Sequence, residues 1–308
     1  MSKVVITHAI SEKAIQLLKN QGYKVQVGGS LKGADAVLSL LKDRIGAKEM
    51  KSAGSQLQVV SNYAVGVDNI DLDAAQKAGI VVTNTPDVLT TAVANHTMAL
   101  IFALTRRIVE ADKFVRKGKF KGWEPDLMIG TEMQGKTLGI VGHGRIGCEV
   151  ASKAQQALGM KVLYYDTLRD KKREKKCGIS FSSLTGLLKR VDLLSLHVPL
   201  LPDTHHLISL KELKMMKQTS YIVNTSRGPV IDEKALVSSL KRGAIAGAAL
   251  DVFEKEPKLT SGLSKLDNVV LTPHIASATR EARQEMAIVA AKNIINVLSK
   301  KRIINRVV

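Results

Sequence analysis

The sequence is poor in several residues on which whole classes of protein depend. It contains two cysteines, too few for a disulfide framework and typical of a protein in a reducing, cytoplasmic compartment. Aromatic residues make up only 4%, which leaves few side chains on which single-stranded bases could stack. The apolar runs are shorter than the roughly 20 residues that a membrane-spanning helix needs. We therefore expect neither a disulfide-stabilised nor a membrane protein.

Acidic residues are also scarce. The chain has 28 acidic and 46 basic residues, and the net charge of +18 could indicate nucleic-acid binding. However, no zinc-finger spacing or basic zipper region is present, and we predict no metal site. The densest basic run, "RDKKREKK" (169–176), is interpreted as a solvated loop. The charge is more typical of an enzyme that handles small anions, without a nucleic-acid partner.

Strand-like apolar runs alternate with helical patterns, which predicts an α/β fold with parallel sheets. Helices are expected over 11–20, 90–117 and 279–299. One series of strands precedes residue 90, and a second follows residue 136; they are 3–9, 23–27, 34–40, 57–63 and 80–84, then 137–142, 161–166, 191–197, "YIVNTS" (221–226), 244–250 and 268–272.

These two series predict two Rossmann- or flavodoxin-like domains with an interdomain cleft. The last helix is long enough to return to the first domain. We therefore predict a discontinuous domain formed by residues 1–98 and 283–308, with residues 99–282 inserted as a dinucleotide-binding domain.

The stretch "GIVGHGRIG" (139–147) carries a dinucleotide-binding fingerprint between a predicted strand and a predicted helix. Its glycines permit a tight turn, close approach of the backbone to a pyrophosphate, and close helix–strand packing. Asp166 follows the next strand, where a carboxylate would bind ribose hydroxyls and repel a 2′-phosphate. This favours NAD, although Arg169 and Lys171 nearby could tolerate NADP. The predicted binding residues are Gly142, His143, Gly144, Arg145, Ile146 and Gly147, with His143 either beside the pyrophosphate or facing solvent.

Seven stretches, one of which includes this fingerprint, carry a resemblance to one known family. They are "NYAVGVDNIDL" (62–72), "TNTPDVLTTAVANHTMALIFALTRR" (83–107), "GKTLGIVGHGRIG" (135–147), "HVPLLPDT" (197–204), "NTSRGPVIDEKAL" (224–236), "GAALDVFEKEP" (247–257) and "NVVLTPHIASAT" (268–279). The chain resembles the D-isomer-specific 2-hydroxyacid dehydrogenases over nearly its whole length. The stretches "LLKDRIG", "NYAVG" and "WEPDLMIG" are most similar to the glyoxylate/hydroxypyruvate reductase branch. The resemblance implies NAD(H)-dependent reduction of a small 2-oxo acid by a homodimer.

The family's catalytic trio corresponds to Arg227, Glu256 and His274. An imidazolium can protonate the substrate oxygen near neutral pH. A carboxylate beside the ring would orient it and stabilise its charged form. A guanidinium offers a planar fork to carboxylate and carbonyl oxygens.

The resemblance also implies other contacts. The backbone N–H groups of Val65 and Gly66 would hold the substrate carboxylate, together with Arg227. Asp251 would bind the nicotinamide carboxamide, and further cofactor contacts are expected from Val198, Thr225, Ser226 and Ser277.

Two other functions stay open at this point. Oxidation of D-3-phosphoglycerate would need cations at the phosphate, which Lys42 or Arg44 could provide. Some relatives are NAD(H)-sensing scaffolds or corepressors without significant turnover, and the net charge of +18 is the local feature that supports this alternative.

Overall fold

The structure is a computed structural model that describes the backbone of residues 1–308 and all side chains except those of Arg173 and Lys176. The chain forms two compact units: unit 1 is residues 1–89 with 277–308, and unit 2 is residues 90–276. The boundaries that we predicted, at 98/99 and 282/283, would cut through helices α4 and α11. The observed boundaries leave both helices whole, with α4 in unit 2 and α11 in unit 1.

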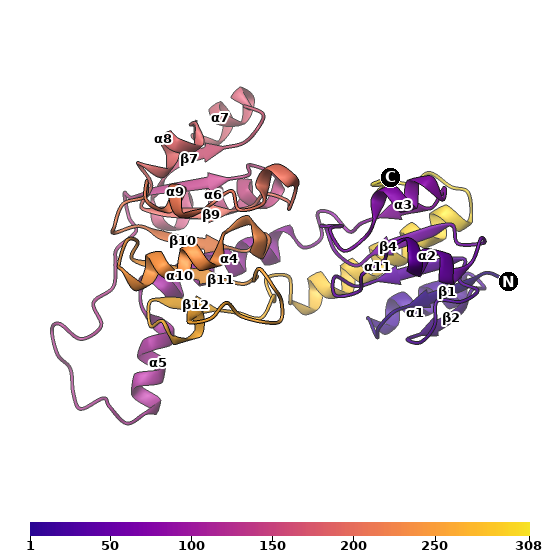
Figure 1. The fold of residues 1–308 in the computed structure, drawn as a ribbon, viewed down its shortest axis with the longest axis horizontal. Helices are drawn as coiled ribbons and strands as arrows, with labels where there is room; N and C mark the ends of the chain where they lie inside the picture. The colour runs from indigo at the N-terminus through magenta and orange to yellow at the C-terminus, as the bar shows by residue number, and fades with distance from the viewer. The chain divides into compact units, whose positions relative to one another are not determined.

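Unit 1 is built on a five-stranded parallel sheet with the order β2-β1-β3-β4-β5 (Figure 1). Its strands are β1 (Lys3–Ile6), β2 (Lys24–Val27), β3 (Ala36–Ser39), β4 (Val59–Asn62) and β5 (Val81–Thr83). The central strands β1, β3 and β4 are almost entirely buried, which is why their sequences are continuous apolar runs.

Helices cover both faces of this sheet. They are α1 (Glu12–Asn20), α2 (Ala47–Ala53), α3 (Leu72–Lys77) and α11 (Arg280–Leu298). Met50 of α2 and Ala75 of α3 pack in one apolar core with Val5, Val37 and Val60 of the sheet. α11 contacts α1, β3 and β4, so residues from the end of the chain complete the domain that the first residues begin.

Unit 2 contains a seven-stranded parallel sheet with the order β12-β11-β10-β9-β6-β7-β8. Its strands are β6 (Thr137–Val141), β7 (Lys161–Tyr165), β8 (Ser180–Phe181), β9 (Leu193–Leu196), β10 (Tyr221–Asn224), β11 (Gly247–Leu250) and β12 (Val269–Leu271). Neighbouring residues point to opposite faces: Leu194 and Ile222 join one core, whereas Leu193 and Val223 join the other. Two parallel sheets confirm the predicted α/β fold.

The helices of unit 2 are α4 (Thr90–Thr105), α5 (Ile108–Arg116), α6 (Arg145–Leu158), α7 (Lys171–Cys177), α8 (Leu184–Leu188), α9 (Leu210–Leu213) and α10 (Glu233–Lys241), with 3-10 turns η1 (Pro202–Thr204), η2 (Gly228–Val230) and η3 (Leu263–Lys265). Two predictions about them were wrong. The single helix expected over 90–117 is broken, because Arg107 adopts a left-handed φ of 54° between α4 and α5. The basic run 169–176, expected to be a loop, instead overlaps α7, which begins at Lys171.

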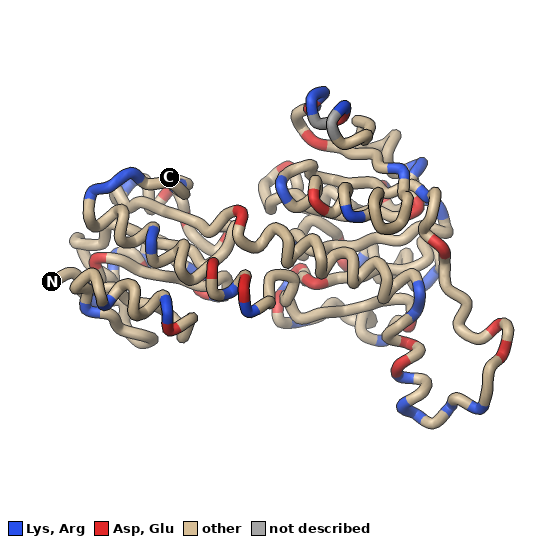
Figure 2. Tube along the Cα trace, turned by 180° about the vertical axis from the view of Figure 1, so that it is seen from behind, with Lys and Arg blue, Asp and Glu red and all other residues tan. Residues whose placement is uncertain are grey.

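The charged residues lie along the chain in both units and are not gathered on one segment (Figure 2). Among the residues that the structure describes, no helix has both the length and the apolar character needed to cross a membrane.

Candidate active site

Polar residues follow the strands of unit 2 at one edge of its sheet. Gly142 comes directly after β6, Asp166 after β7, Asp251 after β11, and Arg227 and His274 follow β10 and β12 closely. Because parallel strands end at the same edge, these residues gather there, where open α/β sheets bind their ligands.

Glu256 and His274 form the pair that the family resemblance predicted to be adjacent. Oε2 of Glu256 lies 2.9 Å from Nδ1 of His274, and its Oε1 accepts a 3.0 Å hydrogen bond from the N–H of Phe253. Burial of the Glu256 carboxyl group favours its neutral form, but these two hydrogen bonds and the charges of His274 and Arg227 outweigh it. The pKa of Glu256 is therefore lowered. The carboxylate is held between the main chain and the ring.

Asp251 fixes the turn that carries His274. Its carboxylate is fully buried and accepts hydrogen bonds from the N–H groups of Ile275 (2.9 Å) and Ala276 (2.8 Å), while its carbonyl accepts one from His274 (2.8 Å). His274 has a left-handed φ of 54°, which is uncommon for a residue with a side chain. These contacts hold the turn in that conformation. The contact of Asp251 with a nicotinamide carboxamide remains a prediction.

Two further partners of Asp251 were not predicted. The hydroxyl of Thr272 donates to Oδ1 at 2.6 Å, and Nε2 of His96 lies 3.2 Å from that hydroxyl and 3.4 Å from Oδ1. Burial raises the pKa of Asp251, but the hydrogen bonds from His96, Thr272, Ile275 and Ala276 reverse the effect and lower it. The available signal was a histidine within the otherwise apolar pattern of α4.

Arg227 lies on a turn that Asn224 organises. Oδ1 of Asn224 accepts from the N–H of Ser226 (3.0 Å) and its hydroxyl (2.7 Å), and Nδ2 donates to the carbonyl of Arg227 (2.9 Å). The Arg227 guanidinium donates to the carbonyl of Ser226 at 2.8 Å. At the next residue, a Cβ on Gly228 would lie 1.9 Å from the carbonyl carbon of Phe253. Only glycine lets this turn reach the segment that precedes Glu256.

The other predicted cofactor contacts come from both units. The hydroxyl of Thr225 is 2.9 Å from that of Thr97 in α4. Val198 packs against the unit 2 core, and its Cγ1 would be 2.9 Å from a Cβ on Gly142. Ser277 belongs to unit 1 and directly follows Ala276.

The glycine-rich loop fits a dinucleotide. Gly142 has a φ of 90°, and a Cβ there would lie 2.7 Å from the carbonyl carbon of His197. A Cβ on Gly147 would lie 2.2 Å from the carbonyl oxygen of Gly142, so α6 packs closely on β6. Gly144, the N-cap residue of α6, would meet nothing within 4 Å. This leaves open space for a pyrophosphate at the helix N-terminus.

The side chains in and beside this loop differ in how far they are buried. Oδ2 of Asp166 accepts the N–H of His143 at 2.8 Å, which places the carboxylate beside the loop. The His143 ring is only 4% exposed and lies 4.6 Å from the Tyr164 ring, so of the two predicted alternatives for His143, facing solvent was wrong. Arg145 is exposed, whereas Ile146 packs against the core.

His197 follows β9, and its backbone carbonyl faces Gly142. It is a buried neutral histidine. Its Nε2 lies 2.8 Å from the hydroxyl of Ser195. Burial lowers the pKa of His197 to about 3, so the ring carries no charge near neutral pH. It supports the loop without adding a cation.

Val65 and Gly66 follow β4 in unit 1. The carbonyls of Ala64, Val65 and Gly66 accept hydrogen bonds of 2.8 Å each from the N–H of Thr85 and the side chains of Asn84 and Asn62, respectively. Across a trans peptide, the C=O of one residue and the N–H of the next point in opposite directions. The bond from Thr85 to Ala64 therefore directs the N–H of Val65 away from Thr85, and the bond from Asn84 to Val65 directs the N–H of Gly66 away from Asn84. Successive N–H groups fixed in this way can hold an anion.

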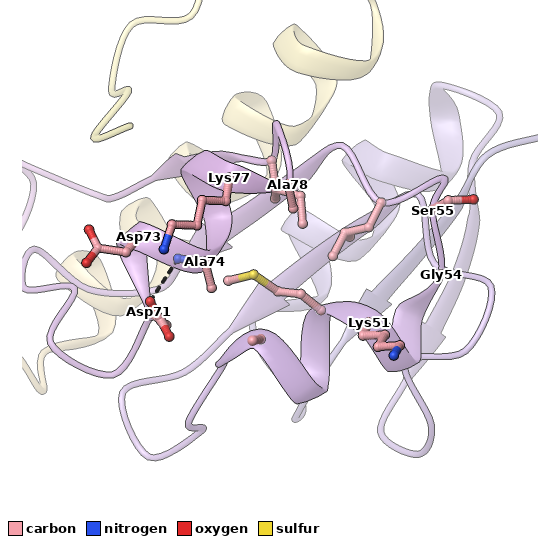
Figure 3. Close-up of a pocket in the computed structure, with 12 residues that line it drawn as sticks. Lys51, Gly54, Ser55, Asp71, Asp73, Ala74, Lys77 and Ala78 are labelled. Carbon is pink, nitrogen blue, oxygen red and sulfur yellow. Dashed lines mark hydrogen bonds between the residues drawn. The ribbon is translucent and has the colours of Figure 1, made fainter.

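A separate pocket of about 760 Å³ lies in unit 1 between α2 and α3, lined by Lys51, Asp71, Asp73 and Lys77 among others (Figure 3). Its lining residues are not those predicted for the active site. Among the described residues, no group of three or more His, Cys, Asp and Glu side chains could hold a metal ion.

Known proteins resemble this chain in both sequence and structure. Residues 98–276 match the family described as D-isomer specific 2-hydroxyacid dehydrogenase, NAD binding domain. A glyoxylate reductase of Thermococcus litoralis is 46% identical over 95% of this chain and 92% of its own. That of Korarchaeum cryptofilum is 51% identical over 86% and 80%, respectively.

Among solved structures, an NADPH-dependent glyoxylate/hydroxypyruvate reductase of Sinorhizobium meliloti in complex with NADP and malonate superposes with a TM-score of 0.90. It is 29% identical, and the match covers 99% of this chain and 96% of that one. The matched domain and the extent of these similarities show that the chain belongs to the D-isomer-specific 2-hydroxyacid dehydrogenases, a family of NAD(P)-dependent oxidoreductases.

Proposed function

We propose that this protein reduces a small 2-oxo acid, glyoxylate or hydroxypyruvate, to the D-2-hydroxy acid with NADH as the preferred reductant. The observation that carries the proposal is the 2.9 Å contact between Glu256 and His274, at the sheet edge that also presents Arg227 and the glycine-rich loop. The relatives named glyoxylate reductase support this choice of substrate.

His274 is the proposed proton donor. Glu256 engages Nδ1, so Nε2 is the ring nitrogen that passes a proton to the oxygen on C2 of the substrate. When bound, the nicotinamide supplies the hydride that reduces C2. The ring is neutral after the step and regains its proton from solvent. Glu256 keeps the ring oriented throughout.

The remaining residues bind and orient. Arg227 would hold the carboxylate and carbonyl oxygens of the substrate, since its turn is fixed by Asn224. The N–H groups of Val65 and Gly66 would bind a carboxylate. The loop from Gly142 to Gly147 would hold the pyrophosphate, and Asp166 the ribose hydroxyls. Val198, Thr225, Ser226, Asp251 and Ser277 are proposed to complete the cofactor site.

A substrate panel tests the proposal. Consumption of NADH and NADPH is measured with glyoxylate, hydroxypyruvate, pyruvate and phosphohydroxypyruvate. Turnover of the first two should exceed that of the others. Preference for the phosphorylated acid would instead indicate a phosphoglycerate dehydrogenase, and tight NADH binding without any turnover would indicate a sensing protein.

His274→Ala examines the mechanism on the same panel. Turnover should fall by about 10²–10⁴-fold, the usual contribution of a positioned acid. Affinity for NADH should change little. A variant that retains wild-type turnover would refute the assignment.

We also infer that the chain forms homodimers through an arm of unit 2 formed by α5 and residues 117–136 (Figure 1). This arm exposes large apolar side chains: Ile108 (52%), Val115 (57%), Phe120 (54%), Trp123 (83%) and Ile129 (62%). Apolar side chains clustered in this way favour a protein partner.

We infer a cytoplasmic location as well. It is supported by Cys148 and Cys177, which form no disulfide.

A further inference from the structure

Arg169 and Glu174 form a bidentate ion pair next to the proposed ribose site. Nε of Arg169 donates to Oε1 of Glu174 at 2.7 Å, and Nη2 donates to Oε2 at 2.8 Å. Two parallel N–H···O bonds fix the plane and the direction of the guanidinium. Arg169 lies in the loop after β7, three residues beyond Asp166, and Glu174 lies in α7.

Other contacts hold Glu174 in place. The hydroxyl of Tyr164 donates to Oε1 at 3.1 Å and accepts the N–H of Asp170 at 2.9 Å. Tyr164 is fully buried and packs against the rings of His143 and Phe181. The side chain of Glu174 is therefore only 15% exposed, compared with 50% for Arg169. The more buried Glu174 therefore sets the position of the more exposed Arg169.

Phe181 adds a second contact for the cation. The Arg169 guanidinium carbon lies 5.5 Å from the centroid of the Phe181 ring, a cation–π distance.

The hydrogen bonds from Arg169, together with that from Tyr164, outweigh burial and lower the pKa of Glu174 to about 2. Glu174 thus stays charged throughout the neutral range, and the pair persists there.

Asp166, at the start of the same loop, is held by separate hydrogen bonds. Its Oδ2 accepts the N–H of His143 at 2.8 Å and its Oδ1 that of Thr167 at 2.7 Å. A carboxylate at this position binds the ribose hydroxyls of NAD, whereas an arginine nearby accommodates the 2′-phosphate of NADP. This chain has both residues, but the arginine is bound to Glu174.

We propose that Glu174 is a specificity-determining residue that favours NADH by holding the Arg169 guanidinium away from the position of a 2′-phosphate. The inference rests on the proposed dinucleotide site. Glu174 touches neither cofactor nor substrate and acts through Arg169. The ring of His143, in the glycine-rich loop, packs against Tyr164, whose hydroxyl donates to Glu174.

The test compares the dissociation constants of NADH and NADPH, measured by fluorescence titration without turnover. Calorimetry then measures the dissociation constants of 5′-AMP and adenosine 2′,5′-bisphosphate. These two nucleotides carry only the adenosine part of the cofactor and differ in the 2′-phosphate. The variants are Glu174→Gln, Arg169→Ala and the double variant. Glu110→Gln is the matched control, because Glu110 pairs with Arg107 through two hydrogen bonds of 2.9 and 2.7 Å on α5.

Glu174→Gln should lower the NADPH/NADH ratio of dissociation constants about fivefold, a modest change because Arg169 is half exposed. Arg169→Ala alone and Glu110→Gln should leave the ratio within about twofold of wild type. In the double variant, the NADPH/NADH ratio of dissociation constants should return to about the wild-type value. Asp166→Ser is the positive control, since loss of its carboxylate also favours NADPH.

Three results would overturn the inference. The ratio could stay unchanged in Glu174→Gln, the gain could survive in the double variant, or Arg169→Ala alone could weaken NADPH binding. Circular dichroism confirms that each variant is folded, and glutamine preserves the shape of the side chain. If the wild-type protein bound neither NADH nor NADPH, the proposed function itself would fail. If it bound both but Glu174→Gln left the ratio unchanged, only the inference about Glu174 would fail.

Discussion

The main-chain N–H of Ala276 donates a hydrogen bond of 2.8 Å to the buried carboxylate of Asp251. This bond, with those from Ile275 and Thr272, ties the end of β11 to the turn that follows β12. His274 lies within that turn. The position of the proposed proton donor thus depends on a carboxylate that is itself inaccessible to solvent.

Asp251→Asn should misplace His274. An asparagine side chain has one acceptor oxygen, so it would turn an NH₂ group toward an N–H of the turn. An unsatisfied buried donor costs about 1–3 kcal/mol, and we expect the free energy of unfolding to fall by that amount. Turnover should fall at least about tenfold. Urea unfolding and steady-state kinetics measure both effects; unchanged turnover would contradict a positioning role.

Glu256→Gln should change how stability depends on pH. The pKa of Glu256 is lowered from its ordinary value of 4.5, so its stabilising contribution is present above that value and is lost as the pH falls below it. Wild type should therefore exceed the variant in stability at pH 6–7, and the difference should shrink toward pH 3. Denaturant unfolding across this range provides the measurement. A difference that grew as the pH fell would have the wrong sign.

Gly228→Ala should destabilise the fold, because the added methyl group would meet the backbone of Phe253 at 1.9 Å. Overpacking typically costs about 1–3 kcal/mol, and a clash with backbone should reach the upper end. Gly144→Ala is the matched control, since a Cβ there meets nothing within 4 Å. The control should keep its thermal stability but bind NADH more weakly. Equal stability losses in both variants would argue against this account.

The arm of unit 2 can be tested by solution mass. Trp123→Ser combined with Ile129→Ser should convert a dimer into a monomer, because both side chains are more than half exposed in the single chain. Leu168→Ser is the control, since Leu168 is 81% exposed but lies outside the arm. Light scattering after gel filtration gives the mass. A dimeric double variant would place the interface elsewhere.

Local pattern was sufficient for most elements of the fold. The strands predicted at 137–142 and 161–166 differ from β6 and β7 by one residue each, because buried parallel strands are short continuous apolar runs. The break at Arg107 was not predictable, because apolar residues continue at helical spacing into Ile108 and Val109. The backbone conformation of Arg107 ends α4, and its side chain then pairs with Glu110.

Contacts made only in the folded chain explain the remaining errors. α7 is rich in like charges, and its Glu174 contacts Tyr164 at the end of β7 and Arg169 in the loop that follows, ten and five positions earlier. His96 and Asp251 are 155 positions apart in the sequence, so their proximity is a property of the folded chain. The adjacency of Glu256 and His274 was predictable only through the family resemblance.

The hydrogen bond from Asn84 to the carbonyl of Val65 has a consequence for mutagenesis. The donors proposed at Val65 and Gly66 belong to the peptide backbone, so replacing either residue's side chain deletes neither of them. The side chain of Asn84 aims the N–H of Gly66, whereas the bond that aims the N–H of Val65 comes from the main chain of Thr85. A mutational scan of this loop should therefore find a sensitive position at Asn84, which the ligand never touches, and should score the residues that do touch it as tolerant.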